Sequence, residues 1–198
     1  MKLGGNMKTG VILARLQPIH NGHLELIMKS IIENDETYVF VGSADKFNKR
    51  NPLPIGLRLQ LTDEAIKHEL GEQGIAYSQA HIKVVPLDDL TDEDDNSHDW
   101  GFYLYSKIVT ETKNPVFTIY YSDGFEIITT WFPAFILRNN ISLYLLSRNA
   151  IASGISATKV REMILKEDKK ELVKWVPPVV VNNLKTIKQH IELANQIK

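Results

Sequence analysis

Residues that could bind a phosphate group gather in one short stretch near the start of the chain, residues 15–23. Arg15 comes first, and two histidines, His20 and His23, follow it three residues apart. Since three residues make almost one helical turn, both imidazole rings can lie on the same side of a helix. The fork of a guanidinium suits contact with an anion. The stretch therefore predicts a phosphate site.

Two predicted elements would hold this stretch at the edge of a sheet. The apolar run at 10–14 predicts a buried strand, and the loop after it contains Gln17 and Pro18. A helix then opens near Asn21-Gly22, with apolar residues at helical spacing: Leu24, Ile27, Met28, Ile31 and Ile32. Ligands of open α/β sheets bind where strands end and helices begin, and the unpaired N–H groups of a helix start suit a phosphate.

A second predicted helix start carries the same kind of chemistry. Ser156 is a good N-cap residue, and Thr158 adds a hydroxyl to the first turn. Arg161 follows one turn later, on the same side as Thr158. The result is a second cradle for an anion; an ordinary capped helix with a surface arginine is the alternative.

Together these two stretches resemble a known superfamily. The pattern Arg-x-Gln-Pro-x-His-x-Gly-His at 15–23 is similar to the His-x-Gly-His signature of the nucleotidyltransferases, and Ile-Ser-x-Thr-x-x-Arg at 155–161 resembles their second signature. Within that superfamily the chain is most similar to archaeal-type nicotinamide-nucleotide adenylyltransferases. It departs mildly at Ala14 and Leu16, where the wider family usually has Gly and Phe or Met.

The resemblance implies adenylyl transfer from ATP to nicotinamide mononucleotide, which yields NAD and pyrophosphate. The residues implied as catalytic are Arg15, His20, His23 and Arg161. Those implied in ATP binding are Gln17, Gly22, Arg50, Ile155, Ser156 and Thr158. Those implied in acceptor binding are Trp100, Ser122 and Asp123. Mg²⁺ would bridge the phosphates with mostly water ligands, and no protein residue is assigned to it.

The basic segment at 46–58 also resembles the nicotinamide-nucleotide enzymes, which carry an Asn/Asp-Pro-x-x-x-Gly-x-Arg run here. Arg50 lies at a position that touches ATP phosphates in some members, and Arg58 is expected to form a structural ion pair. The alternative is a solvated loop surface made of Lys46, Lys49 and Arg50.

The acidic loop at 88–99 is where the chain departs most from those enzymes. They tend to carry Asn-x-x-Trp at the start of the following helix, whereas this chain has Ser97-His98-Asp99-Trp100 after a longer acidic insertion. The resemblance implies that Trp100 stacks on the pyridine ring; an anchor in the core is the alternative. The acidic run is either solvated or a Mg²⁺ site.

Composition excludes several classes of protein. The net charge is −1 and the pI is near 6.6, so no electrostatic footprint for nucleic acid or an anionic membrane is present. No apolar run approaches the length of a membrane span. The absence of cysteine excludes disulfides and thiolate metal sites, and it fits a cytoplasmic protein.

Alternating strands and helices predict a Rossmann-like, doubly wound parallel sheet with C-terminal helices. The predicted strands are 10–14, 37–42, 82–85, 116–121 and 141–146, and helices include 56–70, 99–112 and a short one at 125–132. Residues 1–8 are expected to form a loose leader before a single domain at 9–198. Its helical extension, at about 169–198, has one apolar stripe: Val180, Leu184, Ile187, Ile191 and Ala194.

Other functions stay open at this point. The acceptor could be nicotinate mononucleotide, phosphopantetheine, FMN or a polyol phosphate, with CTP as an alternative donor. A non-catalytic nucleotide sensor of the same fold and a metal-binding module are further alternatives. A homo-oligomer is also possible, because the C-terminal helix and the aromatics Phe132 and Phe135 allow an interface.

Overall fold

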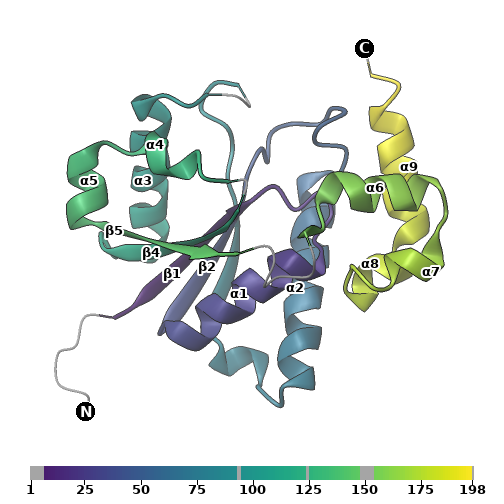
Figure 1. Ribbon diagram of the computed structural model, residues 1–198, viewed down its shortest axis with the longest axis horizontal. Coiled ribbons are helices and arrows are strands. Elements are labelled where there is room, and N and C mark those ends of the chain that lie inside the picture. Colours follow the sequence, from purple (N-terminus) through teal and green to yellow (C-terminus); the bar gives the residue numbers. More distant parts are fainter. Residues whose placement is uncertain (1–6, 93–94, 124, 148–153, 198) are drawn as a thin grey trace.

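The computed structural model describes residues 7–92, 95–123, 125–147 and 154–197. Within these ranges a single parallel sheet of five strands has the order β3-β2-β1-β4-β5. The strands are β1 (Thr9–Ala14), β2 (Glu36–Val41), β3 (Ile82–Pro86), β4 (Phe117–Ser122) and β5 (Ile141–Leu146). Helices cover both faces of the sheet, as Figure 1 shows. The predicted doubly wound α/β fold is confirmed.

Two hydrophobic cores lie on opposite faces of this sheet, because successive side chains of a strand point to opposite sides. Ile12 belongs to one core and its neighbour Val11 to the other. The first core is covered by α1 (Asn21–Glu33), α2 (Ile55–Glu72), α6 (Ala157–Leu165), α7 (Lys169–Leu172), α8 (Pro178–Asn182) and α9 (Leu184–Ala194). The second is covered by α3 (His98–Thr112), α4 (Ile128–Trp131) and α5 (Ala134–Asn139). A 3₁₀ turn, Tyr77–Gln79, precedes β3.

Helix α1 packs unusually close to β1. A Cβ atom on Gly10 would lie 2.0 Å from the Ser30 Oγ atom, so only glycine leaves room for the helix at this point. The Ser30 hydroxyl is hydrogen-bonded to Thr37 on β2 at 3.0 Å, in a buried position. The helix that carries His20 and His23 at its start is thereby held firmly against two central strands.

One predicted helix was wrong in extent. The expected helix at 125–132 is reduced to α4, and α5 follows it after an extended residue, Phe132. Because Phe132 precedes Pro133, it is pushed out of the helical region, with φ −92° and ψ 138°. Phe132 is buried at 2% exposure, whereas Phe135 is 59% exposed, so only the second aromatic offers a surface as predicted.

The apolar stripe predicted for the C-terminal extension is divided between two helices, α8 and α9. Asn183 leaves the helical conformation, with φ −103° and ψ 13°, and separates α8 from α9. Its amide donates to the Val179 carbonyl at 2.9 Å, which satisfies one of the last carbonyls of α8. The predicted stripe is nevertheless buried at Val180, Ile187, Ile191 and Ala194, and half-buried at Leu184. No helix in the described ranges has the length and apolar character needed to cross a membrane.

Candidate active site

A cleft of about 600 Å³ opens at the carboxyl edge of the sheet, beside the central strand β1. Strand β1 pairs with β2 on one side and β4 on the other, so the connections reverse direction here. Ligands of open α/β sheets bind at this kind of switch point. Residues from the ends of all three strands line the cleft: Ala14, Arg15, Gly42, Ser43, Tyr121 and Ser122.

The two histidines form a reciprocal cap at the start of α1. The N–H group of His23 donates to Nδ1 of His20 at 3.3 Å, and the N–H group of His20 donates to Nδ1 of His23 at 3.4 Å. The imidazole rings stack with their centroids 3.6 Å apart and their planes at 19°. Both rings therefore lie on the same side of the helix, as their spacing predicts.

This cap determines which ring nitrogen carries the proton. A neutral imidazole has one donor and one acceptor nitrogen, and the cap uses Nδ1 of each ring as the acceptor. In a neutral imidazole, this arrangement places the proton on Nε2. In the neutral form of each ring, Nε2–H is then the donor, beside a helix start whose dipole also favours an anion. The cap converts two histidines into a paired donor site.

A smaller cavity of about 140 Å³ lies between the starts of α1 and α6. Its lining includes His20, Gly22 and His23 from α1, and Ile155 and Ser156 at the start of α6. Ser156 caps α6, because its Oγ atom accepts from the Lys159 N–H group at 3.3 Å. The small cavity shares His23, Leu26, Ser122 and Ala157 with the larger cleft. The two predicted anion cradles therefore face a common space.

Arg161 joins the two motifs directly. Its Nη1 atom donates to the Gln17 carbonyl at 2.8 Å, across 144 residues of sequence, and its Nη2 atom donates to Thr158 Oγ1 at 3.3 Å. Burial lowers the pKa of Arg161, and the guanidinium of Arg15 lowers it further. The two arginines therefore repel each other, and an anion bound between them would relieve that repulsion. We call Arg15, His20, His23, Ser156 and Arg161, which line the cleft or the smaller cavity that joins it, the cationic side.

Gln17 holds the loop of the first motif in place. Its side chain is buried, and its Oε1 atom accepts from the Leu53 N–H group at 2.9 Å. The preceding residue, Leu16, adopts a left-handed conformation with φ 52°, which turns the chain sharply after β1. Gln17 thus ties this turn to the segment that leads into α2, and it also lines the cleft.

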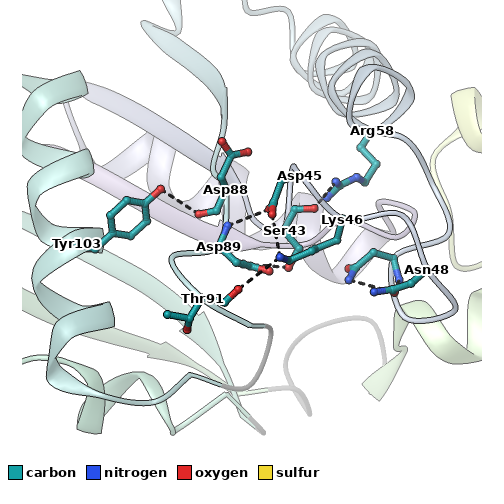
Figure 2. A network of polar contacts seen from close by, with 10 residues as sticks. Ser43, Asp45, Lys46, Asn48, Arg58, Asp88, Asp89, Thr91 and Tyr103 are labelled. Carbon is teal, nitrogen blue, oxygen red and sulfur yellow. Dashed lines mark hydrogen bonds and ion pairs between the residues drawn. The ribbon is translucent and has the colours of Figure 1, made fainter.

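Two loops beyond β2 and β3 are bound together at the cleft, as Figure 2 shows. The Ser43 hydroxyl donates to Asp89 at 3.2 Å, and the Asp89 N–H group donates to Asp45 at 3.0 Å. Lys46 forms an ion pair with Asp45 at 2.9 Å and reaches the Thr91 carbonyl at 3.5 Å. Burial acts to raise the pKa of Asp45, but the hydrogen bonds from Lys46 and the Asp89 N–H group outweigh it and lower the pKa.

Arg58 does not form the predicted ion pair. Its side chain is fully buried, and it donates hydrogen bonds to three backbone carbonyls. Burial lowers the pKa of Arg58, and Asp89 is the acidic residue that opposes this most, although the two side chains form no hydrogen bond. Strand ends leave backbone carbonyls unpaired where the strands diverge. A buried guanidinium can satisfy them, because it donates to several carbonyls at once.

Aromatic side chains form the opposite side of the cleft. Trp100, at the start of α3, packs edge-to-face on Trp131, with ring centroids 5.9 Å apart and planes at 84°. Phe125 packs on Trp131 in the same way at 5.4 Å and 88°. The indole N–H of Trp131 donates to Asn96 at 3.2 Å. All four residues line the cleft, and we call Asn96, Trp100, Phe125 and Trp131 its aromatic side.

A glycine makes this aromatic packing possible. A Cβ atom on Gly101 would lie 2.0 Å from the Trp131 carbonyl oxygen, so a larger residue would force the two segments apart. Trp100 is only 9% exposed, and it belongs to the second core while still lining the cleft. Trp100 therefore anchors the second core and also presents part of its surface to the cleft.

The structure brings nearly all the predicted site residues to these two cavities. The larger cleft is lined by Arg15, Gln17, His23, Arg50, Trp100, Ser122, Thr158 and Arg161. The smaller cavity is lined by His20, Gly22, His23, Ser122, Ile155 and Ser156. Asp123 lines neither of them, and its carboxylate accepts from the Ser147 hydroxyl at 3.0 Å instead.

Sequence reasoning missed other residues of the cleft. Trp131, Phe125 and Asn96 carry no motif, and only the clustering of aromatics around residue 130 could have drawn attention to them. The acidic loop contributes Asp89, Asp92 and Asp95 to the lining. Among the described residues, no cluster of three or more His, Asp or Glu side chains is arranged to hold a metal ion. Residues 93 and 94 of the acidic run, and Gly124, lie outside the described ranges.

Comparison with known proteins identifies similar chains. The profile of the cytidylyltransferase-like family matches residues 14–163. A nicotinamide-nucleotide adenylyltransferase of Methanolobus tindarius is 28% identical over 194 residues, which cover 97% of this chain and 94% of that protein. One from Archaeoglobus fulgidus is 27% identical over 124 residues, or 60% of this chain and 67% of that protein.

Solved structures with the same fold are more distant in sequence. A bifunctional NMN adenylyltransferase/ADP ribose pyrophosphatase from Francisella tularensis superposes with a TM-score of 0.67 at 18% identity, over 95% of this chain. A NadR protein in complex with NAD and AMP-PNP superposes with a TM-score of 0.57 at 21% identity, over 88% of this chain. The chain spans about half the length of these two proteins, at 52% and 46%.

Proposed function

This chain belongs to the cytidylyltransferase-like family, and we propose that it is a nicotinamide-nucleotide adenylyltransferase. It would join ATP to nicotinamide mononucleotide and release pyrophosphate. One observation carries the proposal: the starts of α1 and α6 face one cavity, and the Arg161–Gln17 hydrogen bond at 2.8 Å holds them there. The relatives of similar length and the proteins of similar fold bear names with this chemistry.

The reaction is a substitution at the α-phosphorus of ATP. An oxygen of the acceptor's 5′-phosphate forms a new bond to this phosphorus, and the bond to the bridging oxygen of the leaving pyrophosphate breaks. A phosphate monoester has its second pKa near 6, so the nucleophile is already a dianion at neutral pH. No general base is needed. What the protein must supply is alignment of the reactants and stabilisation of the charge on the phosphates.

The residues of the cationic side meet both needs. The Nε2–H donors of His20 and His23 would contact α-phosphate oxygens, since the cap directs Nδ1 of each ring to the backbone. The guanidinium groups of Arg15 and Arg161 would hold the phosphate chain, with Arg50 beside them. The hydroxyls of Ser156 and Thr158 and the first N–H groups of α6 would bind the terminal phosphates. Such donors are worth most where they are already in place before reaction.

Magnesium fits this site as part of the substrate, MgATP. The described residues offer no cluster of three or more ligands for a resident ion. Mg²⁺ keeps several waters and is often held through substrate phosphates, which suits a site rich in phosphate donors and poor in carboxylate ligands. When bound, it would neutralise charge on the β- and γ-phosphates.

The aromatic side would receive the acceptor's base. The pyridinium ring of nicotinamide mononucleotide is flat and cationic, so it can stack on the cleft surface of Trp100 or Trp131. Asn96 would stay engaged with the Trp131 indole, which keeps that ring in its orientation. The separation of a cationic side from an aromatic side thus matches a substrate with a phosphate at one end and an aromatic ring at the other.

A pyrophosphate-release assay tests the proposal. Purified protein is incubated with MgATP and, in turn, nicotinamide mononucleotide, nicotinate mononucleotide, phosphopantetheine, FMN and a polyol phosphate, and each pair is repeated with CTP. We expect the fastest release with ATP and nicotinamide mononucleotide, with NAD formed in equal amount. Fast release with another acceptor would reassign the substrate. Calorimetric binding of NAD without any turnover would instead support a sensor.

Two further expectations remain proposals. A cytoplasmic location is supported by the absence of cysteine, which suits a reducing compartment. A homo-oligomer is supported only by exposed apolar side chains such as Phe102 and Phe135, whose rings lie 6.2 Å apart. Light scattering of the purified protein would measure the oligomeric state.

A further inference from the structure

Arg58 holds the carboxyl ends of two central strands together from beneath the cleft. It lies at the end of the first turn of α2 and is fully buried. Its Nη1 atom donates to the carbonyls of Arg15 and Gly42, at 2.8 and 2.7 Å, and its Nη2 atom donates to the Ser43 carbonyl at 2.9 Å. Figure 2 shows Arg58 on the side of the network away from the acidic loop. One side chain therefore bridges the exits of β1 and β2.

These carbonyls are where the two strands cease to pair. The last bond between their ends runs from the Gly42 N–H group to the Ala14 carbonyl at 3.1 Å. Immediately beyond, Leu16 and Ser43 adopt left-handed conformations with φ 52° and 49°. Such conformations cost non-glycine residues on the order of 1–2 kcal/mol each, so surrounding contacts must hold them. Arg58 supplies those contacts on both exits at once.

The residues that Arg58 holds are ones that face the cleft. Arg15 and Ser43 line it, whereas Arg58 does not. Through Ser43 the contact extends to Asp89 on the acidic loop, at 3.2 Å. Burial lowers the pKa of Arg58 to about 10, Asp89 opposes this, and Arg15 adds to it, so the buried cation and the Arg15 cation repel each other. Moving a guanidinium out of water is costly, and the three carbonyl partners offset part of that cost.

We propose that Arg58 is a positioning residue that fixes the backbone of Arg15 and Ser43, and so presents the Arg15 guanidinium to the polyphosphate. This proposal rests on the proposed function only in that ATP is taken as the ligand of Arg15. Arg58 touches no substrate; its effect passes through Arg15. Replacing it by lysine keeps the charge but leaves one nitrogen for three carbonyls, so the strand exits lose their alignment.

A double-mutant cycle between Arg58→Lys and Arg15→Met separates positioning from folding. The first readout is the Kd of a non-hydrolysable ATP analogue, measured by calorimetry, which needs no turnover. We expect Arg58→Lys to weaken binding of the analogue about tenfold when Arg15 is present. When Arg15 is already methionine, the same change should weaken it less than about twofold. The effects of two substitutions that act through one contact are not additive. In kinetic assays kcat should fall while the acceptor KM stays within about twofold. Arg58→Gln should be worse than Arg58→Lys.

Thr62→Val is the matched control on the same helix. Thr62 is fully buried, and its hydroxyl donates to the Arg58 carbonyl at 2.7 Å, so the change weakens α2 without touching the strand exits. It should lower Tm and leave the Kd unchanged in both backgrounds. Equal, additive losses from Arg58→Lys in both backgrounds would overturn the proposal, and so would failure of both Arg58 variants to fold at the assay temperature. If the natural protein makes no NAD, the proposed function fails while the calorimetric cycle still reads out the positioning role.

Discussion

The two sides of the cleft are built in different ways. The cationic side is built from the exit of β1 and two helix starts, and all five of its residues belong to two contiguous stretches, 15–23 and 155–161. The aromatic side draws Asn96, Trp100, Phe125 and Trp131 from two stretches, 96–100 and 125–131, which share no common motif. Binding by caps and backbone N–H groups needs particular residues in a particular order, and so it leaves a pattern in the sequence. Binding by packed rings needs only shape, and many sequences can provide that.

Charges of both signs line the cleft. Arg15 and Arg161 repel each other on the cationic side, while Asp89, Asp92 and Asp95 line the cleft from the acidic loop. A ligand with a phosphate at one end and a cationic pyridinium ring at the other matches this polarity. If the two sides act separately, a substitution on the cationic side changes catalysis or ATP binding, and one on the aromatic side changes acceptor binding.

The largest effect is expected from His23→Ala. Removal of the Nε2–H donor should lower kcat about 10²–10³-fold, as the loss of one preorganised donor does in other enzymes, with a smaller change in the KM for ATP. Steady-state kinetics with varied ATP measure it. His23→Asn is the matched control, because its amide oxygen can still accept from the His20 N–H group and preserve the cap. An unchanged kcat in His23→Ala would remove the histidine from the mechanism.

Substitution of the two indoles should affect the other substrate. Trp100→Ala should raise the KM for nicotinamide mononucleotide about tenfold, while the KM for ATP stays within about twofold. The reason is that base stacking on an aromatic ring contributes on the order of 1–3 kcal/mol. Trp100→Leu and Trp131→Leu should show the same change with less disturbance of the fold. The leucine variants avoid the large core cavity that alanine would leave. Trp100→Phe keeps an aromatic face and should lose less. Equal losses for both substrates would break the separation of the two sides.

The two serine caps allow a paired test of stability and binding. Ser156 caps α6 on the cationic side, and Ser97 caps α3 beside Trp100, each accepting one N–H bond at 3.3 Å. Each Ser→Ala change should lower the free energy of unfolding by about 1 kcal/mol in a denaturant titration. Ser156→Ala should weaken ATP and Ser97→Ala the acceptor, each by a few-fold. A result with the substrates exchanged would contradict the assignment of the sides.

The smallest effect is expected from the acidic loop. Asp92→Asn with Asp95→Asn should raise the relative kcat/KM for nicotinate over nicotinamide mononucleotide a few-fold, since fewer negative charges would face the carboxylate of nicotinate. The effect should shrink at high salt, as exposed charges are screened. Glu72→Gln, an exposed carboxylate on α2 that does not line the cleft, is the control. No change in the ratio would show that the ring pocket alone selects the acceptor.

Much of the fold could be read from local patterns. The strands lie within one or two residues of their predicted bounds because apolar β-rich runs are a property of the segment itself. The helix starts at Asn21 and after Ser156 were predictable for the same reason, since a cap acts over three or four residues. The predicted helix bounds were wrong where another residue changes the backbone conformation. Phe132 is the example, because Pro133 forces it out of the helix.

The sequence by itself determined the parallel sheet and the residues of the two phosphate motifs, because periodicity and capping act within a few residues of the chain. Only the tertiary structure decided that Trp131 packs against Trp100, that Asp123 binds Ser147 outside the cleft, and that Arg58 reaches three carbonyls rather than a carboxylate. These contacts join segments that the order of residues leaves unrelated. Their partners are selected by shape and by unpaired polar groups, which exist only once the strands have come together.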